Sequence, residues 1–339
     1  MTFKLRTNFN FVSGYATILD VILKELYKYD SIANCIPLGP VDLKYKQYFN
    51  DKTNYNTNDI ELLMLPPPNN FDMVHPIFRI CPIKNRVIFT MWESTMVDFS
   101  FIEELNKTKC VIVPNEWNKT NFIRQGVNVP IEVLNLFVKP MEVLPEDKGG
   151  KFVFGTANGD ARKQLDKVIR CFFKAFPKNE NDVILKVKTS TYNKRIQHID
   201  SRIVSDHVNF SETELSKWYN SIDVFVSGAT AEGWGMMQCE SMSCGVPVIA
   251  TKYAALTEYF NSDNGYPVKY DEVPSTDYWM VPGGRWSQFD EYDMINQMRH
   301  CYNNRAEVSD KGLRSISTMK KYSIDAFMIG LLNILKKYS

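Results

Sequence analysis

Two short apolar runs, separated by a glycine-containing loop and a helical stretch, most restrict how this chain can fold. Residues 221–227 (SIDVFVS) predict a strand, and residues 246–250 (VPVIA) predict a second, buried strand. Between them, the apolar stretch after Gly235 predicts a short helix. This helix ends at Gly245, because glycine readily adopts the left-handed conformation found at helix ends. A strand, a helix and a second strand in this order are typical of a parallel sheet covered by helices.

Strand-like and helix-like segments alternate through most of the chain, which predicts an α/β protein. Asn115 is the predicted N-cap of a helix that ends at Gly126, and Ser211 with Glu214 forms a capping-box pattern. Residues 45–70 are rich in Asn, Asp and Pro and predict a loop region. The other predicted strands are 3–11, 86–91, 109–113, 131–136, 151–156, 182–189 and 208–210, and the other predicted helices are 13–29, 161–176 and 324–338.

A change in composition near residue 140 predicts a domain boundary. Residues 138–150 are rich in Pro, Glu, Asp and Lys and contain a glycine pair, which is typical of an interdomain linker. A chain of 339 residues is long for one hydrophobic core and sufficient for two domains. We therefore predict an N-terminal domain over 1–140, a C-terminal domain over 141–315 and a terminal helical segment over 316–339.

The composition argues against several classes of protein. With a formal net charge of +1, the chain lacks the basic field that nucleic-acid binding requires. No run of about 18 apolar residues predicts a membrane span, and the first residues lack the apolar core of a signal peptide. Seven cysteines without regular spacing predict reduced thiols, and no Cys/His array indicates a metal. The sequence predicts a soluble, cytoplasmic protein that binds no nucleic acid.

The loop between the two apolar runs carries Glu232, and Glu240 follows it in the predicted helix. A turn from a strand into a helix presents unbonded backbone N–H groups and the positive end of the helix dipole. Such a turn attracts an anionic ligand. The sequence therefore predicts a binding site for a nucleotide diphosphate at this loop.

The segment 231–250 (AEGWGMMQCESMSCGVPVIA) resembles the paired-glutamate signature, Glu, seven residues, Glu, of retaining glycosyltransferases of group 1, or family 4. The usual form is Glu-Gly-Phe-Gly, a short apolar run, and Glu-Ala-Met-Ala-Cys-Gly-x-Pro-Val-Ile-Ala. Here Trp234 stands in place of the phenylalanine, and Ser241 and Ser243 replace alanines. The resemblance implies the GT-B fold, in which two Rossmann-like domains face each other across a cleft and the C-terminal helix crosses back to the N-terminal domain.

The resemblance implies a retaining glycosyltransferase of the hexosyltransferase type. It would move a sugar from a nucleotide-diphosphate sugar to a sugar, glycan or glycoconjugate acceptor, with the N-terminal domain on the acceptor side. Such transfer requires that the negative charge of the departing diphosphate be neutralised. The sequence contains no convincing Asp-x-Asp metal motif, since Asp290 and Asp293 fit better as helix-capping acids. We therefore expect no cofactor and no metal, with cations and helix N-termini stabilising the diphosphate.

Arg162 and Lys163 are the candidate cations, because they follow a predicted strand and begin a predicted helix. Lys163 matches the lysine of the family, whereas Thr156 stands where the family has an arginine. The resemblance implies that Arg162, Lys163 or both hold the diphosphate. The alternative is a solvated pair in the first turn of a helix, where the helix dipole disfavours positive charge.

The two glutamates have different implied roles. Glu240 would accept hydrogen bonds from the ribose hydroxyls, whereas Glu232 would contact the transferred sugar and stabilise positive charge at its anomeric carbon. A structural alternative for Glu240 is a helix glutamate bonded to a neighbouring N–H group. Lys188 lies near the end of a predicted strand and would reach the nucleotide, unless it lies on a solvated edge. Backbone N–H groups of four residues would contact the sugar or phosphate: Gly233, Trp234, Gly235 and Met236.

Three residues of the N-terminal half are weaker candidates for the acceptor side. Gly14 resembles the glycine of the loop after the first strand, although a plain helix start fits equally well. Glu93 follows a predicted strand directly in a Trp-Glu pair that related transferases share. His75 lies in a proline-rich loop without a motif match, and an ordinary surface or packing histidine is the favoured interpretation.

Two other functions remain open from the sequence. A degenerate, GT-B-fold binding protein would have lost Glu232, Glu240 or the two cations, yet all are present. A nicotinamide-dependent oxidoreductase would carry a Gly-x-Gly-x-x-Gly turn after an early strand, which is absent. The absence of a concentrated basic and aromatic stripe predicts at most weak peripheral contact with membranes. The nucleotide base, the sugar, the acceptor and the oligomeric state are not predicted.

Overall fold

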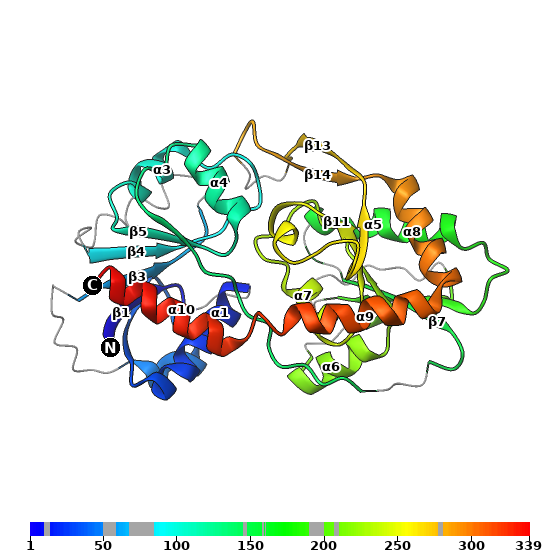
Figure 1. Ribbon diagram of the computed structural model, residues 1–339, viewed down its shortest axis with the longest axis horizontal. Helices are drawn as coiled ribbons and strands as arrows, with labels where there is room; N and C mark the ends of the chain where they lie inside the picture. The colour runs from blue at the N-terminus through cyan, green and yellow to red at the C-terminus, as the bar shows by residue number, and fades with distance from the viewer. Residues whose placement is uncertain are drawn as a thin grey trace. The chain divides into compact units, whose positions relative to one another are not determined.

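The computed structural model (Figure 1) describes residues 1–9, 14–49, 59–67, 85–144, 148–157, 159, 161–189, 200–206, 210–276 and 281–339. The chain forms two compact units. Unit 1 comprises Met1–Phe137, Tyr278–Gly284 and Tyr322–Ser339, and unit 2 comprises Val138–Asp277 and Arg285–Lys321. Each unit is an α/β body with a parallel sheet of six strands, as the alternating pattern predicts.

Unit 1 contains a sheet in the order β2-β1-β3-β4-β5-β6. Every pair of neighbouring strands is parallel. The strands are β1 (Thr2–Thr7), β2 (Ile32–Pro37), β3 (Glu61–Met64), β4 (Arg86–Phe89), β5 (Cys110–Val113) and β6 (Ile131–Val133). The helices are α1 (Gly14–Glu25), α3 (Phe99–Leu105), α4 (Glu116–Arg124) and α10 (Ile324–Lys337), with 3-10 turns η1 (Leu26–Tyr29) and η2 (Leu43–Tyr48).

The prediction of a loop region over residues 45–70 needs correction at residues 61–64, because β3 lies there, in the middle of the sheet. Its four residues are too few to show an alternating pattern, and all are buried. Glu61 is buried because the guanidinium groups of Arg6 and Arg86 bond its carboxylate at 3.0 and 2.9 Å. An acidic residue at a buried strand position is unfavourable unless it is paired in this way.

The C-terminal helix α10 belongs to unit 1, as the resemblance implied. The ring of Phe327 packs edge-to-face on Phe137, with 5.1 Å between the ring centroids. Asp325 accepts a hydrogen bond of 2.8 Å from the hydroxyl of Tyr29, and Figure 1 shows α10 beside α1. The predicted boundary at 315/316 falls inside α9 (Arg305–Met319), which is part of unit 2. Among the described residues, no helix is both long and apolar enough to span a bilayer.

Unit 2 contains a sheet in the order β12-β11-β10-β7-β8-β9, again with parallel neighbours. Read from β7, the chain builds outward to β9, returns beside β7 at β10 and builds outward in the other direction. The point of reversal between β7 and β10 is the position at which doubly wound sheets bind ligands. The strands are β7 (Phe152–Ala157), β8 (Val183–Lys188), β9 (Ile203–Asp206), β10 (Val224–Val226), β11 (Val248–Thr251) and β12 (Gly265–Val268).

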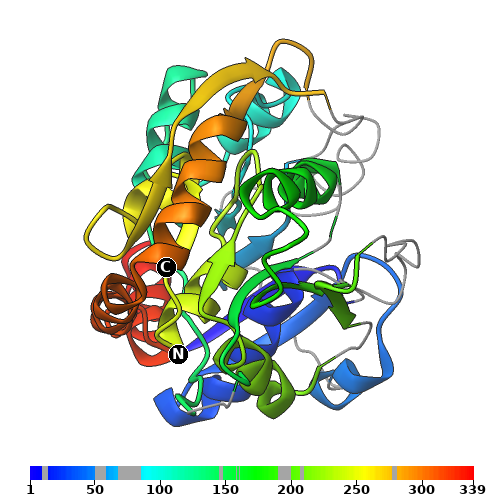
Figure 2. The ribbon, with the colours of Figure 1, turned by 90° about the vertical axis from the view of Figure 1, so that its right-hand side faces the viewer.

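The two faces of this sheet are covered by different helices. Alternate residues of a strand point to opposite faces, so Val224 and Val226 face one side and Phe225 the other. Both valines join an apolar core with Phe172 of α5 (Leu165–Ala175) and Met298 of α8 (Glu291–Asn303), the two helices also visible in Figure 2. On the opposite face, Phe225 packs against Trp218 and Tyr219 of α6 (Glu212–Asn220).

Helix α7 (Met236–Ser243) packs against α9 through a pair of glycines. Gly245 has a φ of +76°, which favours glycine and fits the predicted helix end. A Cβ atom at Gly312 of α9 would lie 2.1 Å from the carbonyl oxygen of Gly245. The close approach of these two backbones holds the helix that carries Glu240.

Several local predictions for unit 2 need correction. The strand predicted at 208–210 is not tested at residues 208 and 209, which lie outside the described residues; strand β9, which ends at Asp206, was not predicted. The helix predicted over 161–176 consists of the 3-10 turn η4 (Ala161–Lys163) and α5, interrupted at Gln164 by a left-handed backbone with φ of +48°. An antiparallel hairpin, β13 (Tyr270–Pro274) with β14 (Arg285–Phe289), was not predicted. The predicted caps at Asn115, Ser211 and Asp290 are confirmed.

Candidate functional site

The candidate site lies in unit 2, at the edge of the sheet where the strand order reverses. Because β7 and β10 are parallel neighbours, the loops that follow them leave the sheet at the same edge. The first loop carries Arg162 and Lys163, and the second carries Glu232. The backbones of the two loops are in contact: Thr230 N–H donates to the Arg162 carbonyl at 3.0 Å. A Cβ atom at Gly228 would lie 2.8 Å from the Lys163 carbonyl, so this approach requires glycine.

Arg162 connects the two loops from a buried position, with 7% of the residue exposed. Its guanidinium donates to the carbonyl oxygen of Ala231 and, at 3.4 Å, to Oε2 of Glu232. It is therefore not a solvated residue of a helix turn. Thr156, which stands where the family has an arginine, lies inside β7 and donates from its hydroxyl to the Val226 carbonyl at 2.8 Å. Thr156 links two strands of the sheet.

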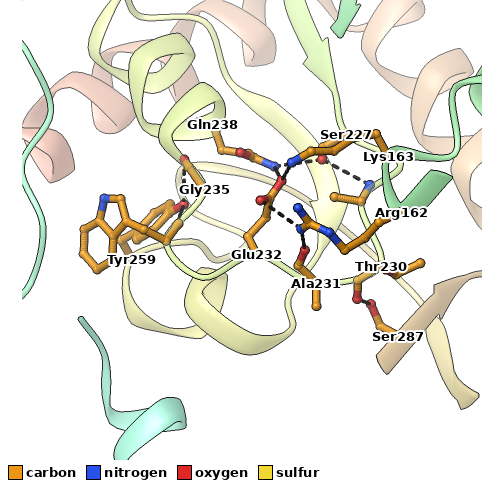
Figure 3. A network of polar contacts seen from close by, with 12 residues as sticks. Arg162, Lys163, Ser227, Thr230, Ala231, Glu232, Gly235, Gln238, Tyr259 and Ser287 are labelled. Atoms are coloured by element: carbon orange, nitrogen blue, oxygen red, sulfur yellow. Dashed lines mark hydrogen bonds and ion pairs between the residues drawn. The ribbon is translucent and has the colours of Figure 1, made fainter. Parts of the chain in front are cut away.

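Lys163 and Glu232 form a close ion pair, with Nζ 2.5 Å from Oε1 (Figure 3). The two side chains are 14% and 9% exposed. Burial raises the pKa of the Glu232 carboxyl, but the charges of Lys163 and Arg162 outweigh burial. Together with hydrogen bonds from Lys163 and Gln238, they lower this pKa from 4.5 to about 2. Glu232 is ionised at neutral pH and surrounded by hydrogen-bond donors.

Gln238 and Ser227 complete this network and were not predicted from the sequence. The Gln238 Nε2 group donates to Oε1 of Glu232 at 3.1 Å and to Oγ of Ser227 at 2.8 Å (Figure 3). Gln238 is 1% exposed, although a polar residue in a helix pattern usually indicates a solvated position. Its only sequence signal is its place between the two glutamates, where burial depends on tertiary packing.

The glycine loop has the geometry expected for a close approach of the backbone. Gly235 has a φ of +89°, and a Cβ atom there would lie 2.5 Å from the hydroxyl oxygen of Tyr259. That hydroxyl donates to the carbonyl oxygens of Trp234 and Gly235 at 2.8 and 3.3 Å, which fixes the turn into α7. The indole of Trp234 is buried against the Tyr259 ring, with 5.4 Å between centroids. Of the four predicted loop residues, Gly233, Trp234 and Gly235 lie in this turn, and Met236 is the first residue of α7.

Glu240 forms a second polar cluster with Tyr219 and Lys188. The Tyr219 hydroxyl donates to Oε2 of Glu240 at 2.8 Å. Burial raises the pKa of Glu240, which Lys188 and the Tyr219 hydrogen bond only partly oppose. Burial also disfavours the charged form of Lys188 and so lowers its pKa, while the negative charge of Glu240 acts in the opposite direction. The two paired glutamates thus have pKa values that are shifted in opposite directions, because only Glu232 has two adjacent cations.

The candidates of the N-terminal half lie in unit 1. Gly14 is the first residue of α1, and Glu93 lies in the loop after β4. Tyr15 connects these loops: its hydroxyl accepts from Met91 N–H at 3.0 Å and donates to the Leu65 carbonyl at 3.3 Å. The start of α1 and the loops after β3 and β4 therefore meet at one edge of the unit 1 sheet. The remaining candidate, His75, lies outside the described residues.

In a comparison with protein families, residues 139–273 match the model of "Glycosyl transferases group 1". This segment contains every candidate site residue of unit 2. Two curated proteins match more locally. D-inositol 3-phosphate glycosyltransferase of Arthrobacter sp. (strain FB24) is 34% identical over 55 residues, and the lipopolysaccharide core biosynthesis mannosyltransferase LpsB of Rhizobium meliloti (strain 1021) is 37% identical over 57 residues. Each match covers 16% of this chain, and 13% and 16% of the respective relatives.

Solved structures of glycosyltransferases share the fold over nearly the whole chain. Anabaena HepE, in complex with UDP and glucose, matches with a TM-score of 0.72 at 14% identity, over 99% of this chain and 100% of HepE. Sucrose-phosphate synthase from Thermosynechococcus elongatus matches with a TM-score of 0.72 at 11% identity, over 99% and 98% of the two chains. S. aureus TarM matches with a TM-score of 0.62 at 18% identity over 81% of this chain, but this chain covers only 54% of TarM. The chain has the GT-B fold of two Rossmann-like domains.

Proposed function

We propose that this protein is a glycosyltransferase that moves a sugar from a nucleotide-diphosphate sugar to a sugar, glycan or glycoconjugate acceptor. The observation that carries the proposal is the cluster of Glu232 with Lys163 and Arg162 at the strand reversal of unit 2. Two cations and a carboxylate at this edge fit a ligand with an anionic end and a sugar. The match of residues 139–273 to the group 1 glycosyltransferases supports the same assignment.

Lys163 is proposed to bind the diphosphate and Arg162 to hold the loop. Lys163 is the more exposed of the two, and its ammonium group has three N–H donors that Glu232 alone does not exhaust. Arg162 is occupied by the Ala231 carbonyl and by Glu232. Positive charge beside the leaving phosphate stabilises the transition state without a metal ion. We therefore propose a metal-independent reaction.

Glu232 is proposed to contact the transferred sugar. Its low pKa keeps it anionic, so it would stabilise the positive charge that develops at the anomeric carbon. We propose retention of configuration by attack on the same face from which the diphosphate departs. In this scheme the departing phosphate accepts the proton of the acceptor hydroxyl, and no covalent sugar–enzyme intermediate forms.

Glu240 is proposed to bind the ribose hydroxyls. Tyr219 bonds one of its carboxylate oxygens and orients the group. The ammonium group of Lys188 lies 5.8 Å from the centre of the Tyr219 ring, and its charge favours the ionised form of Glu240. A carboxylate that accepts from two vicinal hydroxyls makes a strong, charge-assisted contact.

The free, buried thiols of the six described cysteines support a reducing compartment such as the cytoplasm.

The first experiment is a binding panel of UDP, GDP and ADP sugars with the purified chain. We expect one nucleotide series to raise the melting temperature, and Glu240→Ala to weaken its binding by about 1.5–3 kcal/mol, the range for a hydrogen bond to a charged group. UDP is the first nucleotide to test, since it is bound in the HepE structure. A response to no nucleotide sugar would contradict the proposal.

Turnover separates the proposed enzyme from a degenerate binding protein. Hydrolysis or transfer of the sugar is expected from the parent chain, and Glu232→Gln should lower kcat more than it weakens nucleotide binding. Binding without any turnover would favour the degenerate binding protein. Addition of EDTA should leave the rate nearly unchanged, and a large loss would contradict metal independence.

A further inference from the structure

Gln238 is a buried amide that neither the paired-glutamate pattern nor the proposed function uses. It lies in α7, six residues after Glu232, and donates from Nε2 to both Glu232 and Ser227. Its Oε1 atom accepts no hydrogen bond from the part of the chain that the structure describes. A glutamine in such a position is unfavourable unless its hydrogen bonds compensate for the loss of solvent. Both of its bonds lead to the candidate site.

The chemistry of Glu232 determines which end of the Gln238 amide faces it. An ionised carboxylate only accepts hydrogen bonds, so the NH₂ group and not the carbonyl must point toward Oε1. The second N–H of the same group is bonded to the Ser227 hydroxyl oxygen at 2.8 Å. The Ser227 N–H in turn donates to Ile249 of β11 at 2.9 Å. The amide is thereby fixed between the sheet and the carboxylate.

Gln238 shares one oxygen of Glu232 with a cation that the proposed function assigns to the ligand. Oε1 accepts from Lys163 Nζ at 2.5 Å and from Gln238 Nε2 at 3.1 Å. When Lys163 turns toward the diphosphate, its contact with Oε1 changes, whereas Gln238 is anchored to Ser227. Gln238 is also uncharged, so it can orient Oε1 without neutralising the negative charge of Glu232. That charge is needed to stabilise the positive charge at the anomeric carbon.

We propose that Gln238 is a positioning residue that holds the Glu232 carboxylate toward the transferred sugar while the sugar donor binds and reacts. This role rests on the proposed function, because it requires that Glu232 face the sugar. Gln238 acts through Glu232 and does not touch the nucleotide. Its loss therefore affects turnover and leaves nucleotide affinity largely unchanged.

The test uses Gln238→Met, which keeps the length of the side chain and removes the N–H donors. We expect kcat to fall by about 10-fold to 100-fold, the equivalent of one lost hydrogen bond to a charged group. The dissociation constant of the free nucleotide should change less than about twofold. Gln288→Met is the matched control, because the Gln288 amide lies in the same unit and bonds Gln164 and Lys167 rather than Glu232. This control should keep its kcat.

Gln238→Glu supplies a readout that a purely structural role would not produce. The charged groups around Glu232 are Lys163 and Arg162, and this change adds a second carboxyl at hydrogen-bond distance. A Gln238→Glu side chain can donate to Glu232 only while it is protonated, and Lys163 and Arg162 favour its ionised form. Its activity, relative to the parent, should therefore be highest at the acidic end of the profile and should fall as the pH rises and the proton is lost.

The outcomes distinguish failure of this role from failure of the proposed function. An unchanged kcat in Gln238→Met, together with a parent-like pH profile in Gln238→Glu, would overturn the role of Gln238 alone. Absence of transfer by the parent chain would overturn the proposed function and this role with it. If Gln238→Met does not fold, Ser227→Ala is the variant that tests the role, because it removes the hydrogen bond between the Gln238 amide and the Ser227 hydroxyl. Its kcat should fall while its nucleotide affinity is retained, and an unchanged kcat would refute the role.

Discussion

The ion pair between Lys163 and Glu232 leads to a prediction that does not depend on catalysis. Its two side chains are 14% and 9% exposed, and the atoms Nζ and Oε1 are 2.5 Å apart. Each partner therefore compensates for the burial of the other. Removing one of them leaves the buried charge of the other less well compensated, whereas removing both does not. We expect the free energies of unfolding lost in the two single variants to add up to more than the loss in the double variant.

The pKa of Glu232 sets the expected size of the destabilisation. A carboxyl whose pKa is lowered from 4.5 to about 2 gains about 3 kcal/mol of stability as the ion, at about 1.4 kcal/mol per pH unit. Because the folded-state pKa is the lower one, this contribution is present above pH 4.5 and is lost as the pH falls toward 2. Lys163 is the largest cause that lowers this pKa, so Lys163→Met should destabilise unit 2 by about 2–3 kcal/mol at neutral pH.

The measurement is a double-mutant cycle of Lys163→Met, Glu232→Gln and the variant with both changes. Because a chain of two units does not unfold as one transition, hydrogen exchange of the β7 and β10 amides should report the stability of unit 2. We expect a coupling energy of about 1.5–3 kcal/mol. Lys174→Met is the control, since Lys174 is 59% exposed in its pair with Glu291 and should change stability by less than about 1 kcal/mol.

A coupling energy below about 0.5 kcal/mol would refute the reasoning. It would mean that water or the neighbouring donors compensate for either partner alone. A coupling of the expected size that persists unchanged below pH 2 would also contradict it, because Glu232 should then be protonated.

Three further predictions concern the other parts of unit 2. Tyr219→Phe removes the hydrogen bond to Glu240 and should weaken nucleotide binding by about 1.5–3 kcal/mol, measured by calorimetry; unchanged affinity would show that Tyr219 does not orient Glu240. Because burial raises the pKa of Glu240, nucleotide affinity should decrease on acidification well before Glu232 is protonated. Nucleotide affinity measured from about pH 8 to about 4 checks this, and an affinity that does not change with pH would contradict it. Gly312→Ala places a methyl group against the Gly245 carbonyl and should lower the free energy of unfolding by about 1–3 kcal/mol, whereas a stability equal to that of the parent would show that α7 and α9 can separate without cost.

Much of the α/β architecture was predictable because its signals are local. Short apolar runs and helix caps depend on neighbours within a few residues, so β5, β7, β8 and α4 lie within a residue or two of their predicted bounds. Elements whose stability comes from distant partners were missed. Strand β3 includes a buried glutamate that is paired with arginines of β1 and β4, and no local sequence pattern predicts such a strand.

The site divides in the same way. The paired glutamates, the glycines and the two cations were identifiable because they stand at characteristic places in a strand–loop–helix sequence. The contact of Glu232 with Lys163, 69 residues earlier in the chain, depends on the neighbouring positions of β7 and β10 in the sheet. The burial of Gln238 and its bond to Ser227 depend on how α7 packs onto that sheet.

The sequence by itself determined the chemical groups available to the site and the local elements that carry them, because both are written in residue types and short spacings. Only the tertiary structure decided which of these groups meet. It buried Arg162 between two loops, paired Lys163 with Glu232 and shifted the pKa values of Glu232 and Glu240 in opposite directions. Strand order and desolvation produce these differences, and both are properties of the folded chain rather than of any segment of it.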